Sequence, residues 1–396
     1  MKLLYFGTVC NRDAFEARQA KSRRKASVAP LNFESALLEG FADHGVSAEV
    51  YSFPMVASFP GSPLFSWGRR EEEIAGGYLC HWLPAVNLKG LKQLSQRLSV
   101  RRSLRLIRKR QVDAVLIYSV YAPVAGPVQK ACKKYGVPCC CILADLPADM
   151  YENRKMSFLK KALSRLYTGK AIRLQSGFDR YVYLTEAMAR VVNPDAPYLV
   201  VEGIADAVLH DAFSDQPRKK AVMYAGALNE KYGIRSLAEV FLALDLPDWE
   251  LWIFGQGDLS GYFSDLAQKE PRLRYFGRVD RAKVLQAENE ASLLVNPRPV
   301  GERYTKYSFP SKTIEYMLSG TPLLMTELEG IPREYFDHVY SAGDGSRAAL
   351  KAALTGALED GELLRKQKGL TARAFILSRC TAKRQAGRIL EFLSKE

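Results

Sequence analysis

The sequence is poor in the residues that bind metals or cross-link chains. Its 396 residues include seven cysteines and four histidines, and no two cysteines form a Cys-x-x-Cys pair. The histidines form no cluster with the cysteines. A disulfide framework and a zinc site are therefore both disfavoured, and we expect a reducing, cytoplasmic environment.

Long apolar runs are also missing. No stretch approaches the roughly 18 apolar residues that a membrane-spanning helix requires. The apolar residues 3–10 are too few for a secretory signal, and no basic segment of any length precedes them. We expect neither export nor an integral membrane anchor.

Acidic residues are absent from two long windows, residues 74–112 and 153–178. The net charge of +14 is accordingly uneven. Residues 1–203 hold 30 Lys and Arg against 17 Asp and Glu, whereas residues 204–396 hold 27 against 26. The two halves are expected to face different partners.

Short apolar segments that alternate with helical stretches occupy both halves of the chain. We predict strands at residues 1–7, 113–119, 136–145, 180–185 and 197–203, and again at residues 219–228, 248–257, 272–279, 291–298 and 321–327. This alternation predicts an α/β fold with two Rossmann-like domains of parallel strands facing across a cleft. Ligands in such folds bind at the carboxyl ends of the strands, so the cleft is the expected site.

The polar segment 202–220 predicts the boundary between the two domains. One domain would then comprise residues 1–203 and the other residues 204–375. The last residues, 376–396, have a helical pattern, and we expect them to pack back on the first domain. The sequence contains no clear internal repeat and no low-complexity tract.

Glycines follow several predicted strands of the second half. Gly226, Gly255 and Gly277 each stand directly after a strand, and Lys231 lies in a loop that leads to a helix. Glycine permits the close backbone approach that phosphate and nucleotide sites use. Each signal alone is weak, because a glycine after a strand is more often a tight turn and a lone loop lysine is usually solvated.

The sharpest signal lies in residues 304–324, YTKYSFPSKTIEYMLSGTPLL. A Ser-Phe-Pro-Ser turn leads into a short helix that should run to Gly320, with Lys312 in its first turn. A cation is unfavourable there, because helix N-termini attract negative charge. A lysine together with the exposed amides of residues 309–312 predicts a bound anion.

In their order and spacing these motifs resemble the GT-B fold glycosyltransferases of the family 4 type. The resemblance covers residues 180–340, and more loosely the N-terminal half. It rests on YLTEAMARVV with VVEGIAD, then YAGALNEKYGI, LWIFGQGD, RYFGRVDRAKV, SLLVNPRP, SFPSKTIEYMLSGTPLL and EGIPREY. It implies retaining transfer of a sugar from a nucleotide sugar, with UDP as the expected nucleotide, to a hydroxyl of a lipid-linked or polysaccharide acceptor.

The resemblance also implies roles for individual residues. The diphosphate would bind at the helix start and to Lys231, the Glu315 carboxylate would accept hydrogen bonds from the ribose hydroxyls, and the base would lie near the turn after Gly277. The implied donor-binding residues are Gly226, Lys231, Gly255, Arg278, Val279, Ser308, Phe309, Pro310, Ser311, Lys312 and Glu315. No metal and no cofactor is expected, because helix amides and lysines would neutralise the leaving diphosphate and no Asp-x-Asp motif occurs.

The acceptor side is expected in the first half. Asp145, at the end of a predicted buried strand, is a candidate catalytic residue together with Lys231, and a helix cap before Pro147 is an equally weighted alternative for it. Gly7 and Thr8 are expected on the acceptor side. The basic residues 12–27 are expected to form a mobile loop over the cleft.

One position departs from the family. Two glutamates separated by seven residues are frequent in it; Glu315 matches the second, whereas Tyr307 occupies the first, and Glu302 lies five residues earlier. That first glutamate contacts the donor sugar in the family, so the identity of the sugar stays open. A non-catalytic GT-B scaffold that binds a nucleotide sugar or a glycan therefore stays an alternative, whereas no lysine-linked cofactor signature indicates a phosphorylase.

The acid-free windows have two interpretations. Apolar residues recur at helical spacing, as at Leu91, Leu94 and Leu98, and the pattern then shifts phase. The windows are either ordinary helices with cationic outer faces or a surface that docks on an anionic membrane, where each basic group can contribute about 1 kcal/mol. We favour peripheral docking on the inner face of the membrane. Nucleic acid is not an expected partner, because no nucleic-acid module occurs and aromatics do not interleave with the basic runs.

Overall fold

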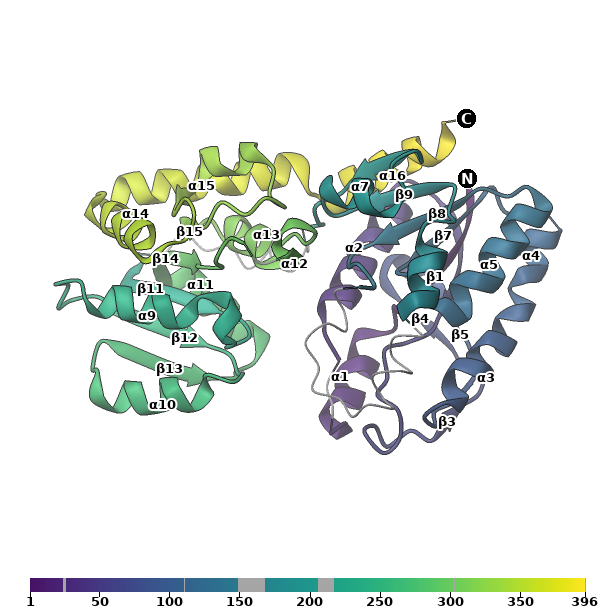
Figure 1. The fold of residues 1–396 in the computed structure, drawn as a ribbon, viewed down its shortest axis with the longest axis horizontal. Helices are drawn as coiled ribbons and strands as arrows, with labels where there is room; N and C mark the ends of the chain where they lie inside the picture. Colours follow the sequence, from purple (N-terminus) through teal and green to yellow (C-terminus); the bar gives the residue numbers. More distant parts are fainter. Residues whose placement is uncertain (24–25, 110, 149–167, 206–216, 302, 396) are drawn as a thin grey trace. The chain divides into compact units, whose positions relative to one another are not determined.

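The computed structural model describes residues 1–23, 26–109, 111–148, 168–205, 217–301 and 303–395 (Figure 1). The chain forms two compact units, each described here by itself. The first comprises Met1–Ile204 with Ala382–Glu396, and the second Ala205–Thr381. The first boundary lies one residue after the predicted one. The second lies six residues later, because the helix α15 (Glu362–Arg379) runs on to Arg379 within the second unit.

The first unit is built on an eight-stranded sheet with the order β10-β9-β8-β7-β1-β2-β5-β4. Its strands are β1 (Lys2–Gly7), β2 (Ser47–Ser52), β4 (Glu71–Glu73), β5 (Leu79–Trp82), β7 (Ala114–Tyr118), β8 (Cys139–Leu143), β9 (Arg180–Tyr183) and β10 (Tyr198–Val200), and a separate antiparallel ribbon pairs β3 (Ser66–Trp67) with β6 (Ala85–Val86). All neighbours in the large sheet are parallel except β4 and β5. The prediction of a parallel α/β unit is confirmed.

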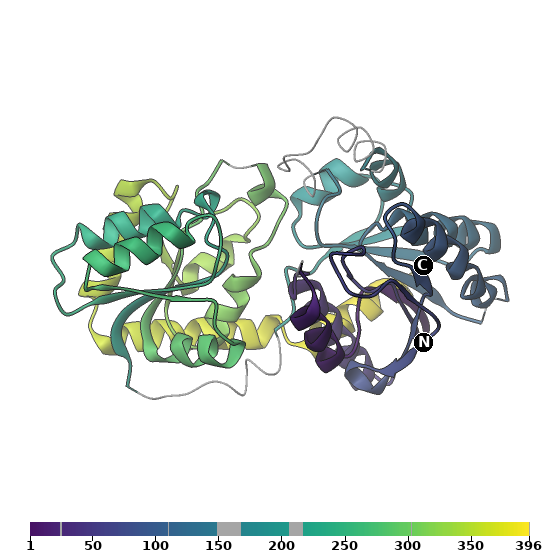
Figure 2. The ribbon, with the colours of Figure 1, turned by 90° about the horizontal axis from the view of Figure 1, so that it is seen from below.

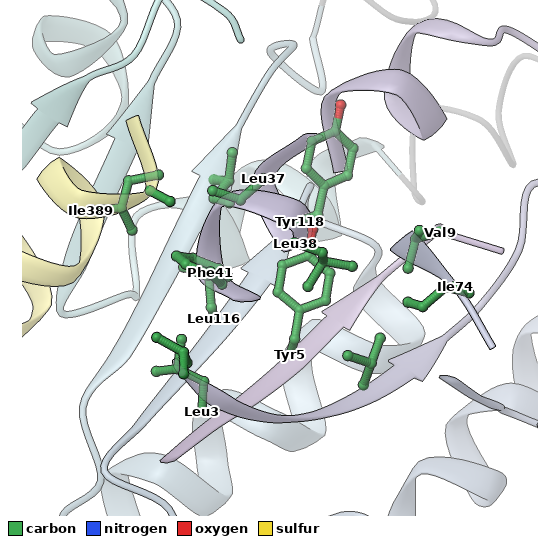
Figure 3. Packing of buried hydrophobic residues seen from close by; sticks show 14 of the residues in the cluster. Leu3, Tyr5, Val9, Leu37, Leu38, Phe41, Ile74, Leu116, Tyr118 and Ile389 are labelled. Atoms are coloured by element: carbon green, nitrogen blue, oxygen red, sulfur yellow. The ribbon is translucent and has the colours of Figure 1, made fainter. Parts of the chain in front are cut away.

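The central strands of this sheet are apolar on both faces. Every residue of β7 and of β8 is buried, which is typical of parallel strands covered by helices on both sides. Figure 3 shows part of the resulting core, in which Tyr5 of β1 and Leu116 of β7 lie beside Leu37 and Phe41 of α2 (Ala29–Asp43).

Helices cover this sheet, and one of them lies where a loop was expected. They are α1 (Arg12–Lys21), α2, α3 (Leu91–Ser99), α4 (Leu104–Arg108), α5 (Ala122–Tyr135), α7 (Ala187–Val192) and α16 (Ala382–Ser394), with short 3-10 turns η1 (Ala75–Gly77) and η2 (Val100–Arg102). The expectation of a mobile loop at residues 12–27 is wrong for residues 12–21. Those residues form α1, because the Asn11 side chain caps the helix by accepting from the Ala14 amide and Phe15 is buried in the core.

The C-terminal helix packs on α2 of the first unit, as predicted. Ala386, Ile389 and Leu393 of α16 belong to the same apolar cluster as Phe41 (Figure 3). Close approach is possible because α2 has a glycine at Gly40, where an added Cβ would lie 2.3 Å from the Ala382 carbonyl oxygen.

The second unit has a six-stranded, fully parallel sheet with the order β13-β12-β11-β14-β15-β16. Figure 2 shows helices on both of its sides. Its elements are β11 (Lys219–Ala225), η3 (Glu230–Tyr232), α9 (Ile234–Leu242), β12 (Glu250–Phe254), α10 (Ser260–Lys269), β13 (Leu273–Gly277), α11 (Arg281–Glu290), β14 (Ala291–Asn296), α12 (Arg303–Lys306), α13 (Ser311–Leu318), β15 (Leu323–Met325), η4 (Arg333–His338), β16 (Tyr340–Ser341), α14 (Arg347–Glu359) and α15.

Each of the ten predicted strands is present, and the strands that sequence reasoning missed lie mainly toward the edges of the sheets. β2 and β16 have exposed or half-exposed residues, so they lack the continuous apolar pattern of a central strand. Within the described residues, no helix is long and apolar enough to cross a membrane. The second acid-free window, residues 153–178, lies largely outside the described residues, as does the segment 206–216 of the predicted linker.

Candidate functional site

The candidate site lies at the carboxyl edge of the second sheet, where tight turns follow β11 and β12. Gly255 has a φ of +126°, and an added Cβ would lie 1.8 Å from the Gly226 carbonyl oxygen. The two turns are also tied to their neighbours, because the Gly226 amide donates to Phe254 O at 3.0 Å and the Gly255 amide donates to Gly277 O at 2.7 Å. A glycine is therefore required at position 255 by backbone packing at this edge.

Lys231 lies in η3, just after this edge. Gly233 closes the loop with a φ of +74° and fits so tightly that an added Cβ would lie 2.0 Å from Pro297 O. The exposed Lys231 ammonium stands 5.2 Å from the ring centre of Tyr232 and 5.0 Å from that of Tyr304. No carboxylate among the described residues pairs with it, and its protein contacts are with the two aromatic faces.

A second cation stands beside it that sequence reasoning did not single out. The Arg298 guanidinium lies 4.8 Å from the ring centre of Tyr232, on the turn that follows β14. It likewise has no carboxylate partner in the described part of the chain. The motif NPRP held the only signal for it, and nothing in the sequence distinguishes this arginine from a solvated one.

The helix α13 (Ser311–Leu318) begins at the predicted anion-binding residues. No side chain caps its first turn, and Phe309 and Pro310 are buried, with Phe309 packed edge-on against Tyr335 at 5.3 Å. Ser308 and Lys312 are half-buried, and Ser311 is exposed. The apolar pair thus fixes the direction in which the helix starts.

Lys312 does not stand free at this helix start. Its ammonium donates to Glu288 Oε1 at 3.1 Å and to Glu315, and so it is held between two carboxyl groups. Glu288 lies on α11 and is fully buried, and sequence reasoning missed it. The sequence gives no signal for it, because α11 has no clear apolar face that would predict which residues point inward.

The three groups have different proton affinities. Burial raises the pKa of Glu288 to about 8, against the opposing charge of Lys312. Burial also raises the pKa of Glu315, but the charge of Lys312 and hydrogen bonds from Lys312 and Glu288 outweigh it, so the net shift is downward. At neutral pH the cluster therefore consists of a neutral Glu288 and a Lys312–Glu315 ion pair, with no net charge.

The side chain of Tyr224, near the end of β11, lies close enough to Arg298 and to Lys312 to feel both charges. Burial raises its pKa, and the nearby charges of Arg298 and Lys312 lower it. Its hydroxyl donates to Ala227 O at 3.1 Å and so lies against the turn that contains Gly226. Because Lys312 is paired with Glu315, the uncompensated positive charge near this tyrosine comes from Arg298.

Two other predicted donor residues lie at the same edge of the sheet. Arg278 is exposed and Val279 is half-buried, after β13 and the turn at Gly277, which has a φ of +64°. The strand β12 separates them from β11 in the sheet. No contact in the described residues joins them to Lys231.

The predicted acceptor-side residues of the first unit surround a buried carboxyl group. The Thr8 amide donates to both oxygens of Glu34 at 3.0 and 2.9 Å, and the Tyr5 hydroxyl donates to it at 2.9 Å. An added Cβ on Gly7 would lie 1.8 Å from Glu34 Oε2. Gly7 and Thr8 are therefore held by Glu34, which sequence reasoning also missed.

Asp145 lies on the surface, two residues after the end of β8. Burial raises the pKa of the nearby Tyr118, and the charges of Glu34 and Asp145 raise it further. The carboxyl edge of the first sheet therefore carries two acidic groups around one tyrosine. Among the described residues, no group of three or more His, Cys, Asp or Glu side chains could hold a metal ion.

A family model matches part of the second unit. Residues 219–360 match the family described as "Glycosyl transferases group 1". This matched segment, which we call the group 1 domain, contains all of the predicted donor-binding residues and both of the carboxyl groups that hold Lys312.

A curated relative and several solved structures are similar to the chain. Phosphatidyl-myo-inositol mannosyltransferase from Mycolicibacterium smegmatis is 30% identical over 184 residues, which are 44% of this chain and 44% of that protein. The match thus spans less than half of that relative.

Solved structures are similar over the whole chain. Sucrose-phosphate synthase from Thermosynechococcus elongatus has a TM-score of 0.64 at 13% identity and covers 99% of each chain. Anabaena HepE in complex with UDP has a TM-score of 0.62 at 15% identity and covers 100% of each chain. At these identities the likeness concerns the fold: the group 1 domain and the first unit together have the GT-B fold.

Proposed function

We propose that the chain is a retaining glycosyltransferase that moves a sugar from a nucleotide sugar, with UDP as the nucleotide, to a hydroxyl of a lipid-linked or polysaccharide acceptor. The observation that carries the proposal is the pair of uncompensated cations, Lys231 and Arg298, over Tyr232 in the segment that matches group 1 glycosyl transferases and that also holds the uncapped first turn of α13. The presence of UDP in the complex of HepE supports the choice of nucleotide.

The charge balance of this site suits a diphosphate. The Lys312 ammonium is neutralised by Glu315, whereas the charges of Lys231 and Arg298 are not matched by carboxylates in the described residues. Two unmatched cations next to uncapped helix amides complement the two or more negative charges of a nucleoside diphosphate. We therefore assign the binding of the diphosphate mainly to Lys231 and Arg298. Lys312, for which this role was predicted, instead orients the Glu315 carboxylate.

Glu315 is suited to bind the ribose. Its side chain is 19% exposed, and the downward shift of its pKa keeps it ionised at neutral pH. An ionised carboxylate can accept hydrogen bonds from two neighbouring hydroxyls, each worth about 1.5–3 kcal/mol. Lys312 and the neutral Glu288 fix the direction of this carboxylate from the side that faces the core.

In the reaction, the bond between the anomeric carbon and the diphosphate oxygen breaks, and a bond from that carbon to the acceptor oxygen forms. The products are a glycoside, a nucleoside diphosphate and a proton. Lys231 and Arg298 stabilise the charge that develops on the leaving diphosphate, which is where electrostatic catalysis acts most strongly. Asp145, exposed at the carboxyl edge of the first sheet, is our candidate for orienting the acceptor.

The lipid side of the proposal draws on the relative from Mycolicibacterium smegmatis, whose name describes transfer of mannose to a phosphatidyl-inositol. A lipid-linked acceptor would place this enzyme at the inner face of a membrane as a peripheral protein. The absence of acidic residues from residues 74–112 supports such a location.

The test compares UDP binding by the wild-type chain with two variants, Lys231→Ala and Glu315→Gln, using isothermal titration. Each should raise the Kd for UDP by about tenfold or more, because each removes a charge-assisted contact worth about 1.5–3 kcal/mol. The exposed residues Lys269 and Glu362, changed in the same ways, serve as matched controls and should leave the Kd unchanged.

A Kd unchanged in both variants would overturn the donor site. Tight UDP binding without hydrolysis or transfer of any nucleotide sugar would instead favour a scaffold that binds the nucleotide sugar and catalyses nothing.

A further inference from the structure

The helix α3 of the first unit has its apolar face turned to solvent. Leu91, Leu94 and Leu98 share one face at spacings of three and four residues, and they are 50%, 55% and 48% exposed. A surface helix of a globular protein normally buries such a stripe in the core. In α3 the arrangement is reversed.

The opposite, polar face of α3 attaches the helix to the unit. Gln96 is only 1% exposed and accepts a hydrogen bond from the Tyr121 hydroxyl, and the Ser95 hydroxyl accepts one from the Val86 amide at 3.0 Å. The Lys92 ammonium donates to Val56 O, and burial lowers its pKa to about 8. Figure 1 shows α3 beside α5, on which it packs. The leucines are thus left outside because specific polar contacts hold the other face inward.

Further apolar side chains continue this stripe at the start of the helix. Phe59 and Phe65 are 42% and 53% exposed, and their rings meet edge to face at 5.8 Å. Backbone hydrogen bonds of the buried Asn87, which directly follows β6, hold both residues near the start of α3. The Asn87 backbone carbonyl oxygen accepts from the Phe59 amide at 2.9 Å, and the Asn87 backbone amide donates to Phe65 O at 2.7 Å. These two exposed rings and the three exposed leucines are together called the α3 surface.

Basic residues lie on α3 and next to it along the chain. Lys89, Arg97, Arg101 and Arg105 are exposed around it, and none pairs with a carboxylate in the residues that the structure describes. No acidic residue occurs between positions 74 and 112. Leucine and phenylalanine with lysine and arginine on either side is the pattern of a helix that lies in the plane of a membrane interface.

We propose that the α3 surface docks on an anionic lipid bilayer, with Leu91, Leu94, Leu98, Phe59 and Phe65 entering the boundary between headgroups and acyl chains. The basic residues then lie among the anionic headgroups, which supply the negative charge that this part of the chain lacks. This inference rests on the proposed function for its purpose, because such docking brings the first unit to a lipid-linked acceptor. Its physical basis is independent of the donor site.

The test is sedimentation of the full chain with vesicles of phosphatidylcholine alone or with about one-third phosphatidylglycerol. The wild-type chain should bind the anionic vesicles and bind the neutral ones weakly. The triple variant L91S/L94S/L98S should reduce the partition coefficient about tenfold or more, since three half-exposed leucines lose their contact with the bilayer. The variant R97Q/R101Q/R105Q should remove the preference for anionic lipid.

A control removes leucines of at least equal exposure elsewhere. Leu363 and Leu364 on α15 are 77% and 55% exposed, and L363S/L364S should bind vesicles as the wild type does. Because all these side chains are exposed, the melting temperatures should stay close to that of the wild type. As a direct reading of insertion, Leu94→Trp should add tryptophan fluorescence that shifts to the blue with anionic vesicles only.

Three outcomes would overturn the inference. One is wild-type vesicle binding by L91S/L94S/L98S, and another is an equal loss in the α15 control. The third is unchanged vesicle binding together with loss of a concentration-dependent dimer, which would make the α3 surface an interface between two copies of the chain. UDP binding by the triple leucine variant should stay unchanged, so a failure of the donor site and a failure of the α3 surface give different results.

Discussion

Replacing Glu34 by glutamine should flatten the pH dependence of stability in the first unit. This carboxyl group is fully buried and accepts hydrogen bonds from Tyr5 and Thr8. Burial raises its pKa from 4.5 to about 7, although the hydrogen bonds oppose that rise. Glutamine keeps the size of the side chain and one accepting oxygen, but it cannot ionise.

The sign of the effect follows from where the proton is held more tightly. Between pH 4.5 and 7 the folded chain retains the Glu34 proton while the unfolded chain has lost it, so this group's contribution to the free energy of unfolding falls as pH rises through that window. Well above pH 7 the loss is complete, at about 3 kcal/mol. Between pH 5.5 and 8.0 the loss is about 2 kcal/mol.

The assay is denaturant unfolding at pH 5.5 and pH 8.0, followed by tryptophan fluorescence. Two of the four tryptophans, Trp67 and Trp82, lie in the first unit, so changing Trp249 and Trp252 to phenylalanine makes the signal specific for that unit. Between the two pH values the parent chain should lose about 2 kcal/mol more of its free energy of unfolding than the Glu34→Gln variant.

The exposed Glu16 of α1, changed to glutamine, is the matched control. It should follow the pH dependence of the parent chain. If Glu34→Gln and Glu16→Gln lose the same free energy between the two pH values, the buried carboxyl group is not the cause and the reasoning fails.

Two further predictions concern the group 1 domain. Arg298→Ala should raise the Kd for UDP by about tenfold in calorimetry, because the unmatched charge over Tyr232 is lost. Arg298→Lys should give an intermediate Kd. If the wild type and Arg298→Ala have equal Kd values, Arg298 is not part of the site. Gly255→Ala should lower the free energy of unfolding of the second unit by about 3 kcal/mol or more, because the φ of +126° and the Gly226 carbonyl oxygen both exclude a Cβ. The measurement is denaturant unfolding, and a loss below about 0.5 kcal/mol would contradict this explanation.

Much of the fold could be predicted because buried parallel strands carry their signal locally. Strands such as β7 and β8 are short, continuous apolar runs, which are typical of the buried parallel strands of an α/β protein. α1 was mistaken for a loop because its sequence is mostly polar, and its stability comes from the Asn11 cap and the burial of Phe15, which depend on the surrounding structure.

The sequence by itself determined the α/β class, the order of the strands along the chain, and two motifs, one with Lys231 and the other with Lys312 and Glu315. Those features depend on short-range patterns and on spacing. Only the tertiary structure decided that the buried Glu288 accepts a hydrogen bond from Lys312, that Arg298 and Lys231 share the ring of Tyr232, and that the leucines of α3 face outward. The reason is physical: charge pairing and burial depend on which elements pack together, and residues distant in sequence, such as Glu288 and Lys312, meet only in the folded chain.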